Sequence, residues 1–236
     1  SGLDRNVRFG VVGATAHFQV GFDSSGDSPV AYGGHSAETI NYVSCHDDLS
    51  LVDKLRASAP EGMTEEELVR FDKLAQTVVL TAQGIPSLFA GEEMLRTKGG
   101  VSNSHDSPDR VNRIDWSFKA DHKDVFDYYR GLIALRRTHP AFRLATAAEI
   151  ERHLRFLDTG DTHVVAYRLV DHAGGDPWRE ILVVYNGARA EKRVRIPPGD
   201  WHAVCLDGRI ASEALAVFSG DSVPVPASSA LIAYLP

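Results

Sequence analysis

The run INYVSCHDD, residues 40–48, is an apolar segment that ends abruptly in a histidine and two acids. Its first residues favour a buried β-strand, and the thiol within it behaves as another small apolar group. His46, Asp47 and Asp48 would therefore stand at the last step of that strand. An imidazole beside carboxylates can transfer protons, ligate a metal or bind polar groups of a substrate. This stretch is a candidate site.

Glu92 and Glu93 occupy the same kind of position, because they follow a second apolar run, SLFAG, at residues 87–91. In parallel α/β architectures, ligands and catalytic groups gather just past the carboxyl ends of the strands. An acid at a strand end can instead cap the next helix. These residues alone leave the two interpretations equally open.

Metal centres and serine hydrolase sites are both disfavoured. His35, His46 and His105 could be combined with nearby acids, but the sequence has no H-x-x-x-H or C-x-x-C spacing. No G-x-S-x-G elbow is present either. We expect neither a metal nor another cofactor.

The elements that must position these residues follow the order strand, helix, strand. A strand is expected over 40–45, and residues 1–39 before it are expected to be mostly loop. Thr64 and Glu67 form a T-x-x-E capping box, and helical spacing of apolar residues behind it predicts a helix over 65–82. With SLFAG as the second strand, this is the βαβ signature of a parallel sheet. A polar loop and a helix over about 123–138 follow.

Beyond Pro140 the chain consists of short β-rich runs separated by Gly, Pro and Asp. Six or more such runs without helical periodicity predict an antiparallel β-sandwich over 144–236. We place the boundary near 143–148. The positions expected to point inward are Val165, Leu182, Val184, Val204 and Ile232.

Composition excludes several classes of partner. The 236 residues are 43% hydrophobic and 24% charged, which is ordinary for a globular protein with a core, and the formal net charge is −7. No Lys/Arg block occurs, so neither nucleic acid nor a membrane is expected as a partner. Two distant cysteines make no disulfide framework. The chain does not begin with Met, so it could start inside a longer gene, and its localisation, secreted or cytoplasmic, stays open.

Two longer stretches resemble a known family. ETINYVSCHDDLSLVDKL, followed by TAQGIPSLFAGEEMLRTKGGVSNSHDSPDRVNRIDW, is similar to glycoside hydrolase family 13, the α-amylase clan. Within that clan the match is to the type I pullulanase and limit-dextrinase group, most specifically in the run from LRTK to IDW. The resemblance implies that residues 1–143 are the last part of a TIM (β/α)8 barrel, including strands seven and eight. Residues 144–236 would be the C-terminal β-sandwich.

The resemblance also implies roles for individual residues. Asp47 matches the clan's third catalytic carboxylate, a transition-state stabiliser, and His46 matches its sugar-hydroxyl ligand. The implied substrate-binding residues are His46, Asp48, Asn103, Asp109 and Asn112. Two positions depart from the group's pattern: Asp48 replaces a frequent Asn, and His105 replaces a frequent sugar-stacking Tyr.

The clan's nucleophile Asp and acid/base Glu have no counterpart in this sequence. The run VRFD, ending at Asp72, imitates the nucleophile motif, but it falls inside the predicted helix, where Arg70 and Asp72 are expected to face solvent. The resemblance therefore implies an α-1,6-glucan hydrolase acting with retention on starch or glycogen, of which this chain holds one catalytic carboxylate and is inactive alone. Its expected partners are the α-glucan and the missing N-terminal part of the barrel.

Two alternatives stay open from the sequence. One is a non-catalytic carbohydrate-binding or regulatory fragment, and the other is an isoamylase-type enzyme or a transferase on the same scaffold. Calcium occurs in some clan members, but this sequence contains no calcium-binding motif.

Overall fold

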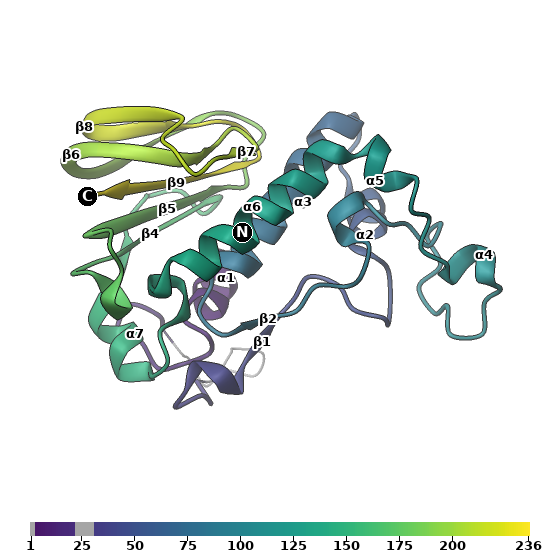
Figure 1. The fold of residues 1–236 in the computed structure, drawn as a ribbon, viewed down its shortest axis with the longest axis horizontal. Coiled ribbons are helices and arrows are strands. Elements are labelled where there is room, and N and C mark those ends of the chain that lie inside the picture. The colour runs from purple at the N-terminus through teal and green to yellow at the C-terminus, as the bar shows by residue number, and fades with distance from the viewer. Residues whose placement is uncertain (1–2, 22–30) are drawn as a thin grey trace.

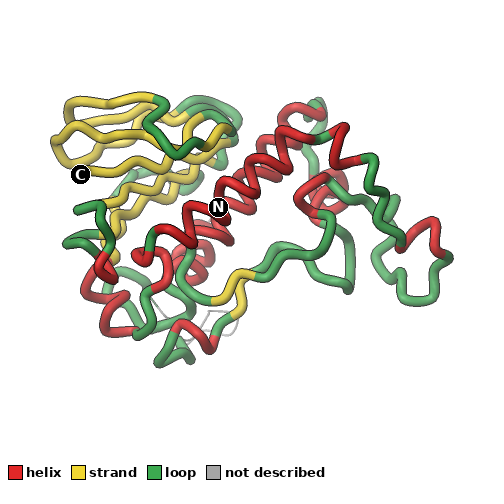
Figure 2. The backbone as a smooth tube through the Cα atoms, viewed as in Figure 1, coloured by secondary structure: helices red, strands yellow, loops and turns green. Residues whose placement is uncertain are grey.

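The computed structural model describes residues 3–21 and 31–236. The first part of the chain is mainly helical and the second is an antiparallel β-sheet (Figure 1, Figure 2). Two long helices lie between that sheet and an extended loop that carries a short helix. In the described part of the chain, no helix has both the length and the apolar character to cross a membrane.

The helices of the first part are α1 (Leu3–Val11), α2 (Leu51–Ser58), α3 (Glu65–Thr81), α4 (Asp109–Asn112), α5 (Phe118–Asp121) and α6 (Lys123–Thr138). The predicted helix over 65–82 is confirmed to within one residue, and the helix over 123–138 is confirmed at both ends. The expectation that residues 1–39 are mostly loop is wrong for α1. This helix is held by a distant part of the chain, since the Gln83 amide donates to the Val11 carbonyl at 2.9 Å.

The capping box starts α3 as its sequence predicts. The Glu67 amide donates to the Thr64 hydroxyl at 3.1 Å, and the Glu67 carboxylate accepts from the Thr64 amide at 3.0 Å. Two otherwise unpaired amides are thereby satisfied at the start of the helix. The helix then packs along α6.

Strands β1 (Ile40–Asn41) and β2 (Ile85–Pro86) pair in parallel across α3, which confirms the strand-helix-strand pattern. Both are shorter than expected, and β2 lies before SLFAG rather than within it. Among residues 3–21 and 31–236 they form a two-stranded sheet, with no third strand beside them. For the same reason Ile40 is 60% and Tyr42 54% exposed, so this first strand is not buried as its sequence suggested.

The second part contains α7 (Ala147–His153), β3 (Leu154–Leu157), β4 (Val164–Leu169), β5 (Glu180–Asn186), β6 (Lys192–Leu206), β7 (Arg209–Ile210), β8 (Ala216–Val225) and β9 (Ser229–Leu235). Single-turn 3-10 helices occur at Ser36–Glu38, Glu92–Met94, Pro140–Arg143 and Ala173–Gly175. The seven strands form one sheet in the order β3-β4-β5-β9-β6-β7, with β8 on β6, and every pair is antiparallel. The antiparallel β-rich prediction is confirmed.

Two hydrophobic cores lie on opposite faces of this sheet. One joins the sheet to α1, α3, α6 and α7, so the helical part and the sheet share a core. The other contains side chains from β4, β5, β6, β8 and β9, so the sheet bends back on itself around it. All five positions expected to point inward are buried, but Leu182 and Val184 belong to the second core. Val165, Val204 and Ile232 belong to the first.

Candidate active site

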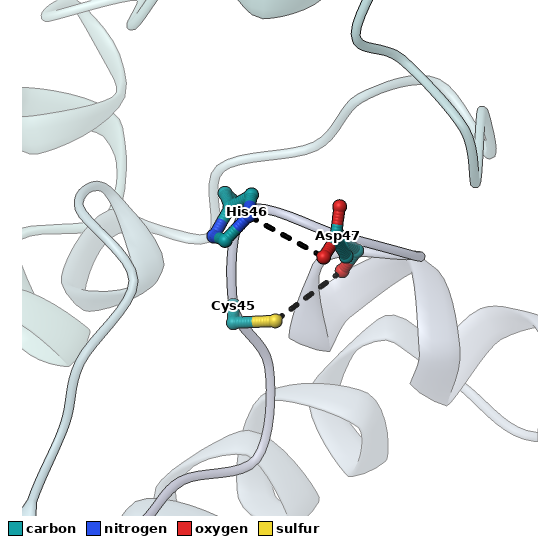
Figure 3. Close-up of side chains that lie close together, drawn as sticks. All are labelled: Cys45, His46 and Asp47. Carbon is teal, nitrogen blue, oxygen red and sulfur yellow. Dashed lines mark hydrogen bonds and ion pairs between the residues drawn. The ribbon is translucent and has the colours of Figure 1, made fainter.

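His46 and Asp47 lie on the bend that follows β1 (Figure 3). Nε2 of His46 is 3.3 Å from Oδ2 of Asp47, and their side chains are 84% and 80% exposed. The thiol of Cys45 points to the main-chain oxygen of Asp47, with 3.7 Å between the two atoms. A proton-donating ring and a carboxylate therefore stand side by side, open to a ligand.

A cavity of about 300 Å³ joins this bend to the loop between β2 and α4. It is lined by His46, Asp47, Phe89, Arg96, Lys98, Ser102, Asn103, Ser104, His105 and Asn112. Four of the residues predicted to act on substrate thus share one depression, although they are far apart in sequence. Both basic side chains in the lining come from the LRTK run.

Two further predicted binding residues do not line this cavity. Asp48 is exposed and adopts a left-handed backbone with φ of 61°. Asp109 is exposed at the first position of α4. Asp48 directly follows Asp47 and Asp109 lies three residues before Asn112, but neither is among the residues that line the cavity.

The amides among the predicted residues are partly engaged by the loop itself. Asn112 donates through Nδ2 to the carbonyls of Ser104 at 2.6 Å and Ser107 at 3.2 Å. Nδ1 of His105 lies 3.0 Å from Oδ1 of Asn103. Asn112 therefore closes the loop, and the imidazole that replaces the expected tyrosine is tethered to its neighbour.

Sequence reasoning missed a set of residues that fix the two sides of the cavity. Asp53 of α2 accepts hydrogen bonds from the Thr97 hydroxyl at 2.5 Å and the Lys98 amide at 2.7 Å. Burial acts to raise the pKa of Asp53, but hydrogen bonds from Thr97, Lys98 and Ser50 hold it below its ordinary value. The ammonium of Lys98 donates to the His46 carbonyl at 3.3 Å. The start of α2, the loop after β2 and the bend that carries His46 and Asp47 are thus connected.

Arg96 fixes the far wall of the same cavity. Its guanidinium donates to the carbonyls of Ala90, at 2.9 Å, and Asn112, and it lies 4.5 Å from the centre of the Phe89 ring. Gly91 is required beside it, because φ is +99° and an added Cβ would lie 2.7 Å from the Arg96 side chain. A residue with a side chain at position 91 would displace the Arg96 guanidinium from these contacts.

Glu92 is not exposed beside the cavity, contrary to the sequence interpretation of Glu92 and Glu93 as a pair of acids at a strand end. Its side chain is buried and accepts from Ser44, from Gln76 at 2.8 Å and from the Phe89 amide at 3.2 Å. Burial raises the pKa of Glu92 to about 7. Glu93 is half-buried and accepts from the Gly91 amide at 2.9 Å.

Asp72 does not face solvent, and the sequence expectation for it was wrong. It lies one turn after Leu68 on the face of α3 that packs on α6, where Tyr129 donates to Oδ1 at 2.7 Å. Burial raises the pKa of Asp72 to about 8. Arg70 is partly covered and pairs with Asp207 at 2.7 Å. Neither residue reaches the cavity.

One group of side chains in the described ranges has the ligand types of a metal site. Donor atoms of Cys45, His46 and Asp47 lie within 4.8 Å of one another. They come from three consecutive residues, two of them largely exposed, whereas protein metal sites draw ligands from separated positions on a fixed framework. The arrangement suits hydroxyl binding better than metal binding.

Comparisons with known proteins identify a family for the chain. Residues 150–209 match the family described as pullulanase, all-beta domain. Pullulanase of Bacillus subtilis (strain 168) is 40% identical over 161 residues, which cover 68% of this chain and 22% of the relative. The chain therefore spans about a fifth of that relative's length.

Solved structures give the same result over nearly the whole chain. Pullulanase from Bacillus acidopullulyticus is 42% identical with a TM-score of 0.85, covering 97% of this chain and 26% of that one. Pullulanase from Paenibacillus barengoltzii, in complex with maltohexaose and α-cyclodextrin, is 39% identical with a TM-score of 0.83. That match covers 100% of this chain and 34% of the other.

Proposed function

Because the chain belongs to the pullulanases, as their C-terminal portion, we propose that it forms one side of the active site of a starch-debranching glycoside hydrolase. The reaction is cleavage of α-1,6-glucosidic bonds in pullulan or limit dextrins, with retention. The observation that carries this proposal is the His46–Asp47 pair, exposed at a strand end and facing the Asn103–Asn112 loop across one cavity.

Asp47 acts as the third carboxylate of the reaction. Retaining hydrolysis uses a nucleophile and an acid/base about 5–5.5 Å apart and passes through a ring with oxocarbenium character. A fixed carboxylate that grips ring hydroxyls more strongly as that charge develops favours the transition state over the relaxed ring. His46 donates a hydrogen bond to a neighbouring hydroxyl. Asn103 and Asn112 contact the glucan in the same cavity. Asp48 and Asp109, which lie outside its lining, contact the glucan farther from the scissile bond.

The nucleophile and the acid/base come from protein outside this sequence. Three buried acids lie near the site. Asp72 and Glu92 are hydrogen-bonded in the interior behind the bend, and Asp53 is held by hydrogen bonds from Thr97 and Lys98. The chain alone therefore lacks the pair that each step of retaining hydrolysis needs.

Residues 1–143 are the final segment of a (β/α)8 barrel, and residues 144–236 are its C-terminal β-domain. In this assignment β1 and β2 are the seventh and eighth barrel strands. The support is their parallel pairing across α3 and the exposure of Ile40, Tyr42 and Ile85, a set of apolar side chains that further strands would cover. The partner of this surface is the N-terminal part of the barrel.

The substrate is an α-glucan. The similar Paenibacillus barengoltzii pullulanase has been solved with maltohexaose and α-cyclodextrin, and an exposed carboxylate-imidazole pair suits the dense hydroxyl groups of such a ligand. No observation on the described residues favours a non-catalytic fragment or a transferase over this function.

The test uses the protein that contains this chain together with the rest of its barrel. Asp47→Asn should lower kcat on pullulan by several orders of magnitude, because a transition-state contact is lost while the fold is kept. His46→Ala should lose roughly 10²–10³-fold, as for one transition-state donor. The matched control is Asp121→Asn, an exposed acid at the end of α5. Near wild-type turnover of Asp47→Asn would refute the proposed function.

A further inference from the structure

A cluster of buried polar side chains lies behind the bend that carries His46 and Asp47. Its members are Ser44, Glu92, Gln76, Asp72 and Tyr129, each no more than 2% exposed. They come from the bend, the turn after SLFAG, helix α3 and helix α6. Polar groups removed from water in this way are expensive unless each finds a partner, so their hydrogen-bond pattern is informative.

Glu92 is surrounded by donors. The Ser44 hydroxyl donates to one carboxylate oxygen, and the Gln76 amide, at 2.8 Å, and the Phe89 main-chain amide, at 3.2 Å, donate to the other. A carboxyl group that accepts three hydrogen bonds and donates none is matched by the ionised form. These hydrogen bonds stabilise the ionised form of Glu92, against the burial that raises its pKa to about 7.

Asp72 shows the opposite pattern. Tyr129 donates to Oδ1 at 2.7 Å, but Oδ2 has no hydrogen-bond partner, and neither does Oε1 of Gln76. Both are buried oxygens, one turn apart on α3. Burial of Oδ2 without a donor favours the neutral form of Asp72.

Two hydrogen bonds tie these buried groups to the helices. Tyr129 of α6 donates to Asp72 of α3, and the amide nitrogen of Gln76 on α3 donates to Glu92. The other charged groups nearby are Lys73, beside Asp72 on the same helix, and Glu93. The Gln76 amide thus holds the carboxylate of Glu92 where the Ser44 hydroxyl reaches it.

We propose that Glu92 is a positioning residue for the reaction, which holds Ser44, and through it the His46–Asp47 bend, against helix α3. The expected effect on catalysis rests on the proposed function. The anchoring of the bend by Ser44 and Glu92 does not depend on it. Ser44 is the last buried residue before the partly exposed Cys45 and the exposed residues 46–48. The other attachments of this bend are hydrogen bonds to main-chain oxygens, from Lys54 to Val43 and from Lys98 to His46.

The first experiment measures amide hydrogen exchange in the 236-residue chain. Ser44→Ala removes one hydrogen bond to a buried carboxylate, which should speed exchange of the protected amides in segment 87–89 by roughly tenfold. These are the amide of Ser87, which donates to the Asn41 carbonyl of β1 at 2.8 Å, and the amide of Phe89, which donates to Glu92 at 3.2 Å. Amides in α3 and α6 should keep their wild-type rates. Ser44→Thr retains the hydroxyl and should restore protection. Glu92→Gln replaces one acceptor oxygen with an NH2 group, which would face the donors that now bind Glu92, so it should loosen the same segment. Glu93→Gln, at the neighbouring acid, should not.

The second experiment measures pullulan hydrolysis by the protein that also contains the rest of the barrel. Ser44→Ala should lower kcat roughly tenfold with KM within about twofold, and Ser44→Thr should recover most of kcat. Unchanged exchange in Ser44→Ala overturns the anchoring, whatever the activity. Faster exchange with unchanged kcat overturns the catalytic role. Full activity of Asp47→Asn would instead overturn the proposed function, and the exchange result would still decide the anchoring.

Discussion

Asp72→Asn should make the protein more stable at neutral pH. Burial raises the pKa of Asp72 to about 8, whereas an aspartate in an unfolded chain titrates near 3.9. Between about pH 4 and about pH 8 the folded state therefore keeps a proton that the unfolded state releases. Since the unfolded state binds fewer protons in this window, stability falls as pH rises through it.

The magnitude follows from the width of that window. At pH 7 the unfolded aspartate is about three pH units above its pKa, and each unit corresponds to 1.36 kcal/mol, so Asp72 destabilises the fold by at most about 4 kcal/mol. Asn has the shape of the neutral carboxyl group. It offers Tyr129 an acceptor, so the substitution removes the titration and retains that contact.

The assay is urea unfolding of wild type and Asp72→Asn at about pH 5 and about pH 7.5. We expect the variant's advantage in free energy of unfolding to grow with pH by about 1–3 kcal/mol across this interval. Asp121→Asn, at an exposed site, should follow wild type at both values. A stability difference that does not change with pH, or an Asp72→Asn protein that is weaker at both values, would refute a protonated Asp72.

Three further predictions follow from the packing and the caps. Trp201→Ala should lower the free energy of unfolding by about 3–5 kcal/mol, because this indole is fully buried in the second core and urea unfolding will measure the loss. Thr64→Ala should cost about 1 kcal/mol in the same assay, since the cap of α3 is lost. A thiol reagent should label one cysteine in the native protein and two after unfolding. Cys45 is partly exposed, whereas burial raises the pKa of the Cys205 thiol to about 11.

The parts of the fold that could be predicted from sequence are those with local causes. The capping box at Thr64 and Glu67 and the apolar spacing behind it are sufficient to specify α3. Alternation and turn residues likewise indicate the strands after Pro140. Helix α1 escaped prediction because its place depends on a contact with Gln83, more than seventy positions away in the sequence.

The sequence also indicated which residues meet at the cavity, but not the state of the acids around it. His46, Asp47, Asn103 and Asn112 are brought together as the family resemblance implies. Asp72 was misplaced because helical periodicity treats every carboxylate as a solvent-facing group. Its burial becomes visible only when α6 supplies a hydroxyl donor against that face of α3.

Clusters of hydrogen bonds to main-chain oxygens are still harder to read from sequence. Lys98 and Arg96 fix the cavity through carbonyls of residues that are distant or unremarkable in sequence, such as Ala90. Nothing in a side-chain pattern marks such an acceptor, because every residue carries one. These clamps were therefore found only in the structure.

The most direct test of the central claim is the release of reducing sugar from pullulan by the purified 236-residue chain, with and without the upstream barrel segment added. We expect no turnover by the chain alone, since Asp47 cannot act as both nucleophile and proton donor. We expect turnover when the missing part of the barrel is supplied, and its loss in Asp47→Asn. Clear hydrolysis by the chain alone, abolished by Asp47→Ala, would contradict the account.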